Sequence, residues 1–158
     1  MIALQIQAHP VPLWLAAAPV RGGKTASEPD DSEQARLGRP LRVLIVEDEF
    51  YISLHTRGLL QALGHVVVAV AVSADQAVRI AESERPDVVL MDIRLTGSRD
   101  GIDAADEISN RFGIASIFVT ANTDRATRQR AESVHPLGFL EKPLTEQRLR
   151  LGLGKIIH

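Results

Sequence analysis

Residues 41–158 alternate between short runs of β-branched and apolar residues and longer segments in which apolar positions recur every three or four residues. The short runs have the near-continuous hydrophobic character of strands that are buried on both faces. They are LRVLIV (41–46), VVVAVA (66–71), DVVLM (87–91), ASIFV (115–119) and GFLE (138–141). This pattern predicts five strands separated by helices, as in α/β proteins.

The segments between the runs have the spacing of amphipathic helices. Their stripes are Ile52, Thr56, Leu59, Leu60 and Leu63; Ala74, Ala77, Val78 and Ala81; Ile102, Ala105, Ile108 and Phe112; and Leu149, Leu153 and Ile156. Segment 123–133 is more polar and predicts a weaker helix. We expect Ser73 and Thr145 to cap helix N-termini, and Gly64 and Gly113 to end helices.

Strands that alternate with helices in this way form parallel sheets, because each helix returns the chain to the same edge. Right-handed crossovers leave few strand orders, and the flavodoxin-like order 2-1-3-4-5 is the common one for five strands. We therefore expect a doubly wound, five-stranded parallel sheet with five helices on its two faces. In this order the first and third strands are adjacent, and functional groups gather beyond their carboxyl ends.

The first forty residues differ in composition from the rest of the chain. They hold five of the eight prolines, and segment 22–38 is rich in Gly, Ser, Asp and Glu without a hydrophobic period. Such a segment buries too little apolar surface to offset the entropy lost on ordering. We therefore interpret residues 1–40 as a disordered N-terminal extension and residues 41–158 as one folded domain.

The overall composition excludes several classes of protein. The formal net charge is −2 and aromatic residues make up 4% of the chain, so it lacks the positive field and the stacking rings of a nucleic-acid-binding protein. No apolar run approaches the roughly 18–20 residues that span a bilayer. Cysteine is absent, which excludes disulfides and thiolate catalysis and is typical of a reducing compartment such as the cytoplasm.

Polar and charged residues follow the predicted strands at the edge where function is expected. Glu47 and Asp48 follow the first strand, Asp92 the third, Thr120 the fourth and Lys142 the fifth. Three carboxylates in one small pocket repel each other and raise one another's pKa unless a cation lies between them. Oxygen ligands favour a hard divalent ion, and Mg²⁺ is the usual one where phosphate also binds.

The same residues suit phosphoryl transfer to a carboxylate. Asp92 would be the nucleophile, the metal would neutralise the incoming oxygens, and Lys142 and Thr120 would hold the product anion. Taken singly, each residue is an ordinary helix cap or solvated turn residue. The prediction depends on all of these positions carrying the appropriate chemistry at one edge of the sheet.

Four segments together resemble the signature segments of the bacterial response-regulator receiver domain. They are LRVLIVEDE, PDVVLMDIRL, SIFVTAN and GFLEKPL, and the likeness covers about all of residues 41–158. The resemblance implies that Asp92 is the phospho-accepting aspartate and that Glu47 and Asp48 are the acidic pair that helps bind Mg²⁺. It also implies that the backbone carbonyl of Arg94 contributes to the metal site.

The resemblance assigns roles to residues of the last two segments as well. Thr120 resembles the residue that carries the switch hydroxyl in the family, and Lys142 resembles the family's characteristic lysine. Phe139 occupies the position of the switch aromatic, without the hydroxyl that often ends that side chain. The peptide bond between Lys142 and Pro143 is commonly cis in the family, so we expect a cis bond here.

Two further features depart from the family's usual pattern. Arg94 and Asn122 each lie two residues beyond a site residue, at the rim that faces attacking water. Our hypothesis is that Arg94 tunes the lifetime of the aspartyl phosphate. The loop 96–100 (TGSRD) is polar and contains glycine. One interpretation is that it shapes access beside Asp92, and a plain solvent loop is the safer assumption.

The resemblance also implies partners. A histidine kinase or a histidine phosphotransfer protein would supply the phosphoryl group. Phosphorylation would bias a two-state equilibrium in the surface formed by the fourth helix, fifth strand and fifth helix, through which the chain would bind a downstream protein or form a homodimer. Because the chain stops at His158, directly after the last predicted helix, we expect a stand-alone receiver.

Several alternatives stay open on the sequence alone. An aspartyl phosphatase of the haloacid-dehalogenase type needs a second Asp where this chain has Arg94. A flavin or nucleotide module needs phosphate-binding loops, whereas the first loop here is EDEF and no G-x-G-x-x-G segment occurs. His55, His65 and His135 lack metal-ligand spacing with one another. The remaining alternatives are a phosphate sink and a degenerate receiver that serves as a scaffold.

Overall fold

The structure is a computed structural model that describes residues 39–156. The predicted disordered extension, residues 1–40, lies outside the described residues except for its last two. Five parallel strands form one sheet in the order β2-β1-β3-β4-β5, which confirms the predicted topology. Their bounds are β1 (Arg42–Val46), β2 (Val66–Ala71), β3 (Val88–Asp92), β4 (Ser116–Thr120) and β5 (Gly138–Glu141).

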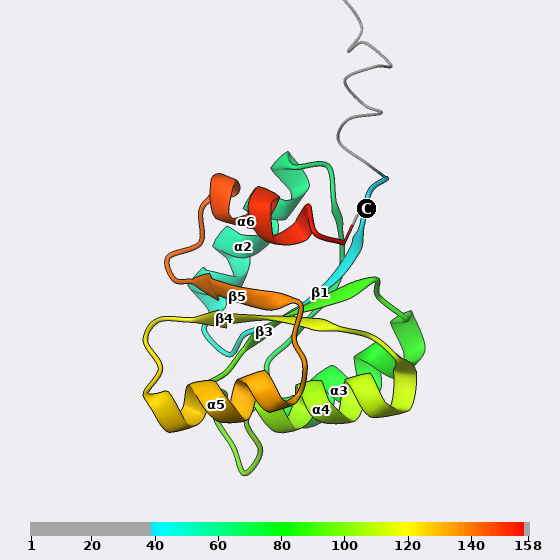
Figure 1. Cartoon of the computed structure of the whole chain (residues 1–158). Helices are drawn as coiled ribbons and strands as arrows, with labels where there is room; N and C mark the ends of the chain where they lie inside the picture. The colour runs from blue at the N-terminus through cyan, green and yellow to red at the C-terminus, as the bar shows by residue number, and fades with distance from the viewer. Residues whose placement is uncertain (1–38, 157–158) are drawn as a thin grey trace, which may run out of the picture. The chain divides into compact units, whose positions relative to one another are not determined.

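Helices cover both faces of the sheet (Figure 1), as the pattern predicts. The helices of the described residues are α2 (Phe50–Ala62), α3 (Ala74–Glu84), α4 (Gly101–Phe112), α5 (Arg125–Ser133) and α6 (Glu146–Leu153). Helices α3, α4 and α5 lie on one face, and α2 and α6 lie on the other. None of the helices between residues 39 and 156 is long and apolar enough to cross a membrane.

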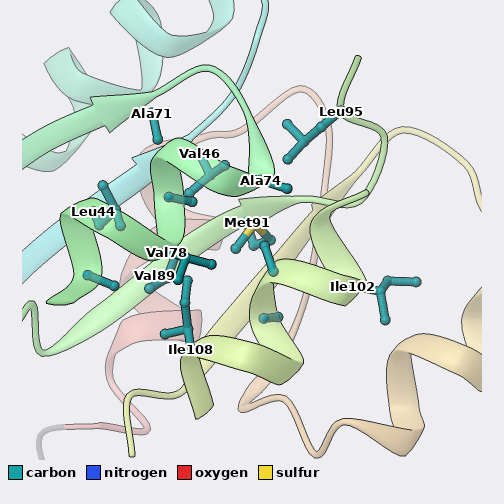
Figure 2. Packing of buried hydrophobic residues seen from close by; sticks show 14 of the residues in the cluster. Leu44, Val46, Ala71, Ala74, Val78, Val89, Met91, Leu95, Ile102 and Ile108 are labelled. Carbon is teal, nitrogen blue, oxygen red and sulfur yellow. The ribbon is translucent and has the colours of Figure 1, made fainter. Parts of the chain in front are cut away.

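Alternate side chains of each strand supply two separate hydrophobic cores. Leu44 of β1 and Met91 of β3 belong to the core under α3 and α4, and Ile108 of α4 belongs to the same core (Figure 2). Ile45 and Leu90, their neighbours along the same strands, belong to the core under α2 and α6. This two-sided burial explains why the strands read as continuous apolar runs in the sequence rather than as alternating ones.

Helices cover both faces of the sheet, but the strands are not equally buried. The central strands β3 and β4 are fully buried, and β1 is buried except at its first residue. The edge strands β2 and β5 are half-buried, and Val66 at the start of β2 is 49% exposed. A strand at the edge of a sheet has one neighbour instead of two, so its side chains keep some contact with water.

Local signals in the sequence place the helix ends. The hydroxyls of Ser73 and Thr145 accept hydrogen bonds from the third backbone N–H of their helices, as predicted. Asp100 and Asp103 form a reciprocal capping box at the start of α4. Gly113 ends the same helix in the left-handed region, at φ 69°, where a residue without Cβ is favoured.

Candidate functional site

The acidic residues converge where β1 and β3 lie side by side. Glu47 and Asp48 come directly after β1, and Asp92 is the last residue of β3, one position later in the strand than the pattern predicts. One carboxylate oxygen from each of the three lies within 4.8 Å of the others. Glu47 and Asp92 are buried, with exposed fractions of 4% and 6%, whereas Asp48 is half-buried.

Lys142 adds a positive charge to the same cluster from the end of an edge strand, β5. It follows β5, and its ammonium Nζ lies 2.7 Å from Glu47 Oε2 and 2.8 Å from Asp92 Oδ2. Its backbone N–H donates to the carbonyl of Thr120, 2.9 Å away, which ties the loop to the end of β4. The next peptide bond, between Lys142 and Pro143, is cis, as the resemblance implies.

For both Glu47 and Lys142, burial shifts the pKa in one direction and the hydrogen bond to the oppositely charged partner shifts it in the other. Burial raises the pKa of Glu47 above its ordinary value, although the hydrogen bond from Lys142 acts to lower it. Burial also acts to lower the pKa of Lys142, but the hydrogen bonds and charges of Asp92 and Glu47 outweigh it, so the pKa of the ammonium is raised. The lysine is therefore cationic at neutral pH and offsets part of the repulsion between the carboxylates.

Asp92 is held by its backbone surroundings as well as by Lys142. Its Oδ1 accepts a hydrogen bond of 3.0 Å from the backbone N–H of Arg94. On its main-chain side, the first residue of α4 is Gly101, where a Cβ would lie 1.8 Å from the carbonyl oxygen of Asp92. The sequence pattern did not indicate Gly101, a residue whose missing Cβ permits this close approach.

Asp48 takes its partner from the loop between β3 and α4. Its Oδ2 accepts hydrogen bonds from the backbone N–H of Thr96, at 3.0 Å, and from the Thr96 hydroxyl. The hydroxyl bond, together with the amide bond, lowers the pKa of Asp48 despite some opposing desolvation. The interpretation of residues 96–100 as a plain solvent loop is therefore wrong, because one end of the loop contacts the acidic cluster.

A cavity of about 560 Å³ opens beside these groups. Asp92, Thr120 and Lys142 line it, together with Tyr51 and His55 of α2. Thr120 is the last residue of β4 and is 8% exposed. The cavity gives a small solute access to Asp92.

The two rim residues and the aromatic residue of β5 lie farther out. The guanidinium of Arg94 is exposed and donates a 3.3 Å hydrogen bond to the backbone carbonyl of Asn122. Phe139 is half-buried against Phe118, with ring centroids 5.6 Å apart. The guanidinium of Arg128, on α5, covers its ring at 3.5 Å from the centroid, a contact that the sequence pattern did not indicate.

The donor set of the cluster suits a metal ion. Three carboxylates that offer oxygen ligands alone fit a hard divalent cation better than zinc or copper, which favour nitrogen and sulfur ligands. Two of the three are buried, where an additional positive charge relieves their mutual repulsion. The arrangement combines a carboxylate cluster whose chemistry suits a metal ion, a paired lysine and a buried threonine around one aspartate.

A family model described as the response regulator receiver domain matches residues 43–153. The chain belongs to this family. The receiver family accounts for the topology, for the acidic cluster at the phosphorylation site and for the lysine after β5. It also excludes the haloacid-dehalogenase and flavin alternatives that the sequence leaves open.

Similar proteins include known regulators. The chain is 37% identical over 106 residues to the transcriptional regulatory protein PdtaR of Mycobacterium tuberculosis. The aligned residues make up 67% of this chain and 51% of PdtaR. It is 39% identical over 103 residues to the phyllosphere-induced regulator PhyR of Methylorubrum extorquens. That alignment covers 64% of this chain and 38% of PhyR. The chain thus spans about half or less of the length of these relatives.

Solved structures give the same result. The signal receiver domain of a modulated diguanylate cyclase from Desulfovibrio desulfuricans G20 superposes with a TM-score of 0.72 at 37% identity. The match covers 76% of this chain and 95% of that domain. A receiver domain by itself therefore accounts for nearly all of the described fold.

Proposed function

We propose that residues 41–158 are a phosphoacceptor module in a two-component phosphorelay and that Asp92 receives the phosphoryl group. The observation that supports this proposal most directly is the double contact of the Lys142 ammonium with Glu47 and Asp92. This contact places a cation beside Asp92, which lines a cavity large enough for a phosphoryl group. The chain then acts as a substrate of its donor, not as an enzyme on external substrates.

The proposed reaction moves one phosphoryl group from nitrogen to oxygen. A carboxylate oxygen of Asp92 attacks the phosphorus of a phosphohistidine, the P–O bond forms, the P–N bond breaks, and the leaving imidazole takes a proton from solvent. Lys142 then pairs with a phosphoryl oxygen, and the Thr120 hydroxyl donates a hydrogen bond to another. Glu47, Asp48, Asp92 and the backbone carbonyl of Arg94 would hold Mg²⁺, which would supply positive charge to neutralise the transferring group.

The donor and the output follow from this reaction. A histidine kinase or a histidine phosphotransfer protein in the cytoplasm carries the phosphohistidine. The output surface is α5, β5 and α6, through which the chain binds a downstream protein or a second copy. Helix α5 buries Ala131 alone among its nine residues, so it is weakly anchored and suited to move. Thr120 and Phe139 would couple that movement to the phosphoryl group.

Phosphorylation by a small-molecule donor tests the proposal. The chain is incubated with phosphoramidate and Mg²⁺, and intact mass spectrometry measures the addition of one phosphoryl group. We expect the adduct in the wild type and its loss in Asp92→Asn or when Mg²⁺ is chelated. Asp106→Asn is the matched control, because Asp106 is an exposed carboxylate on α4 that bonds to Asn110. An adduct that persists in Asp92→Asn contradicts the proposal.

A further inference from the structure

Asp48 differs from the other two carboxylates in what holds it. Glu47 and Asp92 are buried and share the ammonium of Lys142. Asp48 is half-buried, and its hydrogen bonds come instead from Thr96, four residues beyond Asp92 in the loop to α4. The orientation of the most solvent-accessible carboxylate in the cluster therefore depends on one exposed loop residue.

The geometry of this contact is specific. The amide and the hydroxyl of Thr96 both donate to the same oxygen, Oδ2. A carboxylate oxygen has about two lone-pair sites, so the two donors of Thr96 satisfy Oδ2 and leave Oδ1 free of them. Donation from two directions also restricts rotation about the bond that carries the carboxylate.

We propose that Thr96 is a positioning residue for the divalent cation at the acidic cluster, because its two hydrogen bonds orient Asp48 as a charged, single-oxygen ligand. This inference rests on the proposed function, since it requires that the cluster binds Mg²⁺. Groups that hydrogen-bond to a metal-ligating carboxylate align it with the ion, and their removal typically lowers metal affinity by about 10–100-fold.

The loop that carries Thr96 is itself anchored. Arg99 lies 2.9 Å from Asp75 of α3 and 2.6 Å from Glu107 of α4, measured between guanidinium nitrogen and carboxylate oxygen. Asp100, the next residue, pairs with Arg130 of α5 at 2.6 Å. These three ion pairs restrict the far end of the loop, so the position of Thr96 does not depend on its contact with Asp48 alone.

The test is a calorimetric Mg²⁺ titration of the full chain without a phosphoryl donor. Thr96→Val keeps the shape and the amide bond but removes the hydroxyl, whereas Thr96→Ser restores the hydroxyl. We expect Thr96→Val to bind Mg²⁺ about tenfold more weakly than the wild type and Thr96→Ser to bind within about twofold of it. Thr96 is exposed, so neither change disturbs the core.

A matched control exists at the start of α5. Thr127 donates to Asp124 through its amide, at 2.9 Å, and through its hydroxyl, at 2.7 Å, and neither residue belongs to the acidic cluster. Thr127→Val should therefore leave Mg²⁺ affinity unchanged. Equal or tighter binding by Thr96→Val, with normal binding by the wild type, overturns the role of Thr96 alone. A wild type that binds no Mg²⁺ overturns the proposed function and this inference together.

Discussion

At the scale of single residues, the site depends on balancing charges that are close and poorly solvated. Glu47 and Asp92 would repel each other at this depth, and Lys142 lies within hydrogen-bonding distance of both. The same lysine is thus part of the folded structure before any phosphoryl group arrives. In the proposed reaction the same residue would later pair with the product, which would connect stability to chemistry.

Replacement of Lys142 by Met should expose this double role. Loss of the ammonium leaves two buried carboxylates unpaired, and breaking a buried ion pair costs about 3–5 kcal/mol. We expect the free energy of unfolding, measured by urea denaturation, to fall by about 3 kcal/mol and to recover partly on addition of Mg²⁺. The control is Lys155→Met, which removes an exposed lysine. Equal stability of the two variants would contradict the argument.

At the scale of elements, the site depends on how closely α4 approaches β3. The helix begins at Gly101, whose backbone N–H donates to the carbonyl of Ile93 at 3.0 Å. The carbonyl of Asp92 occupies the space that any side chain at position 101 would need. The position of the proposed phosphoacceptor and the start of α4 are therefore not independent.

Gly101→Ala should disturb both the position of Asp92 and the start of α4. The added Cβ forces α4 or the end of β3 to move, and such overpacking costs about 1–3 kcal/mol. We expect thermal unfolding to begin at lower temperature and phosphorylation of Asp92 to slow. Gly58→Ala is the matched control, because nothing lies within 4 Å of a Cβ at this position in α2. That change should stabilise the protein by up to about 1 kcal/mol. Unchanged stability of Gly101→Ala would show that the close approach is relaxed in solution.

At the scale of the whole molecule, one histidine links the pH of the solution to the stability of the sheet. The imidazole Nδ1 of His65 accepts a hydrogen bond of 3.3 Å from the backbone N–H of Leu41, just before β1. Burial, with a smaller contribution from the charge of Arg150, lowers the pKa of His65. Protonation would place a charge in a half-buried position and remove the acceptor.

The sign of the pH effect follows from this lowered pKa. The stabilising contribution of His65 is complete above its unfolded pKa of about 6.5 and is lost as the pH falls below that value through the lower folded pKa. We expect the free energy of unfolding to decrease between about pH 7 and pH 5 and His65→Asn, which keeps an acceptor, to flatten that decrease. His135→Asn is the control for loss of an imidazole that leaves the Leu41 contact intact. Parallel pH curves for wild type and His65→Asn would contradict the assignment.

Much of this protein was determined by the sequence alone. The topology and the gathering of Glu47, Asp92 and Lys142 followed from apolar periodicity, because parallel strands that alternate with helices end at one edge. Helix ends were also predictable, since a cap such as Ser73 acts within one turn of the chain.

The tertiary structure alone decided the contacts that hydrophobic periodicity does not specify. The hydrogen bonds of Thr96 to Asp48, the approach of Gly101 to Asp92 and the stacking of Arg128 on Phe139 belong to this class. Each depends on distances of a few ångströms between residues that are not neighbours in the chain. Periodicity assigns a residue to an element and a face, whereas such contacts are set by how loops and helix ends pack once the elements have assembled.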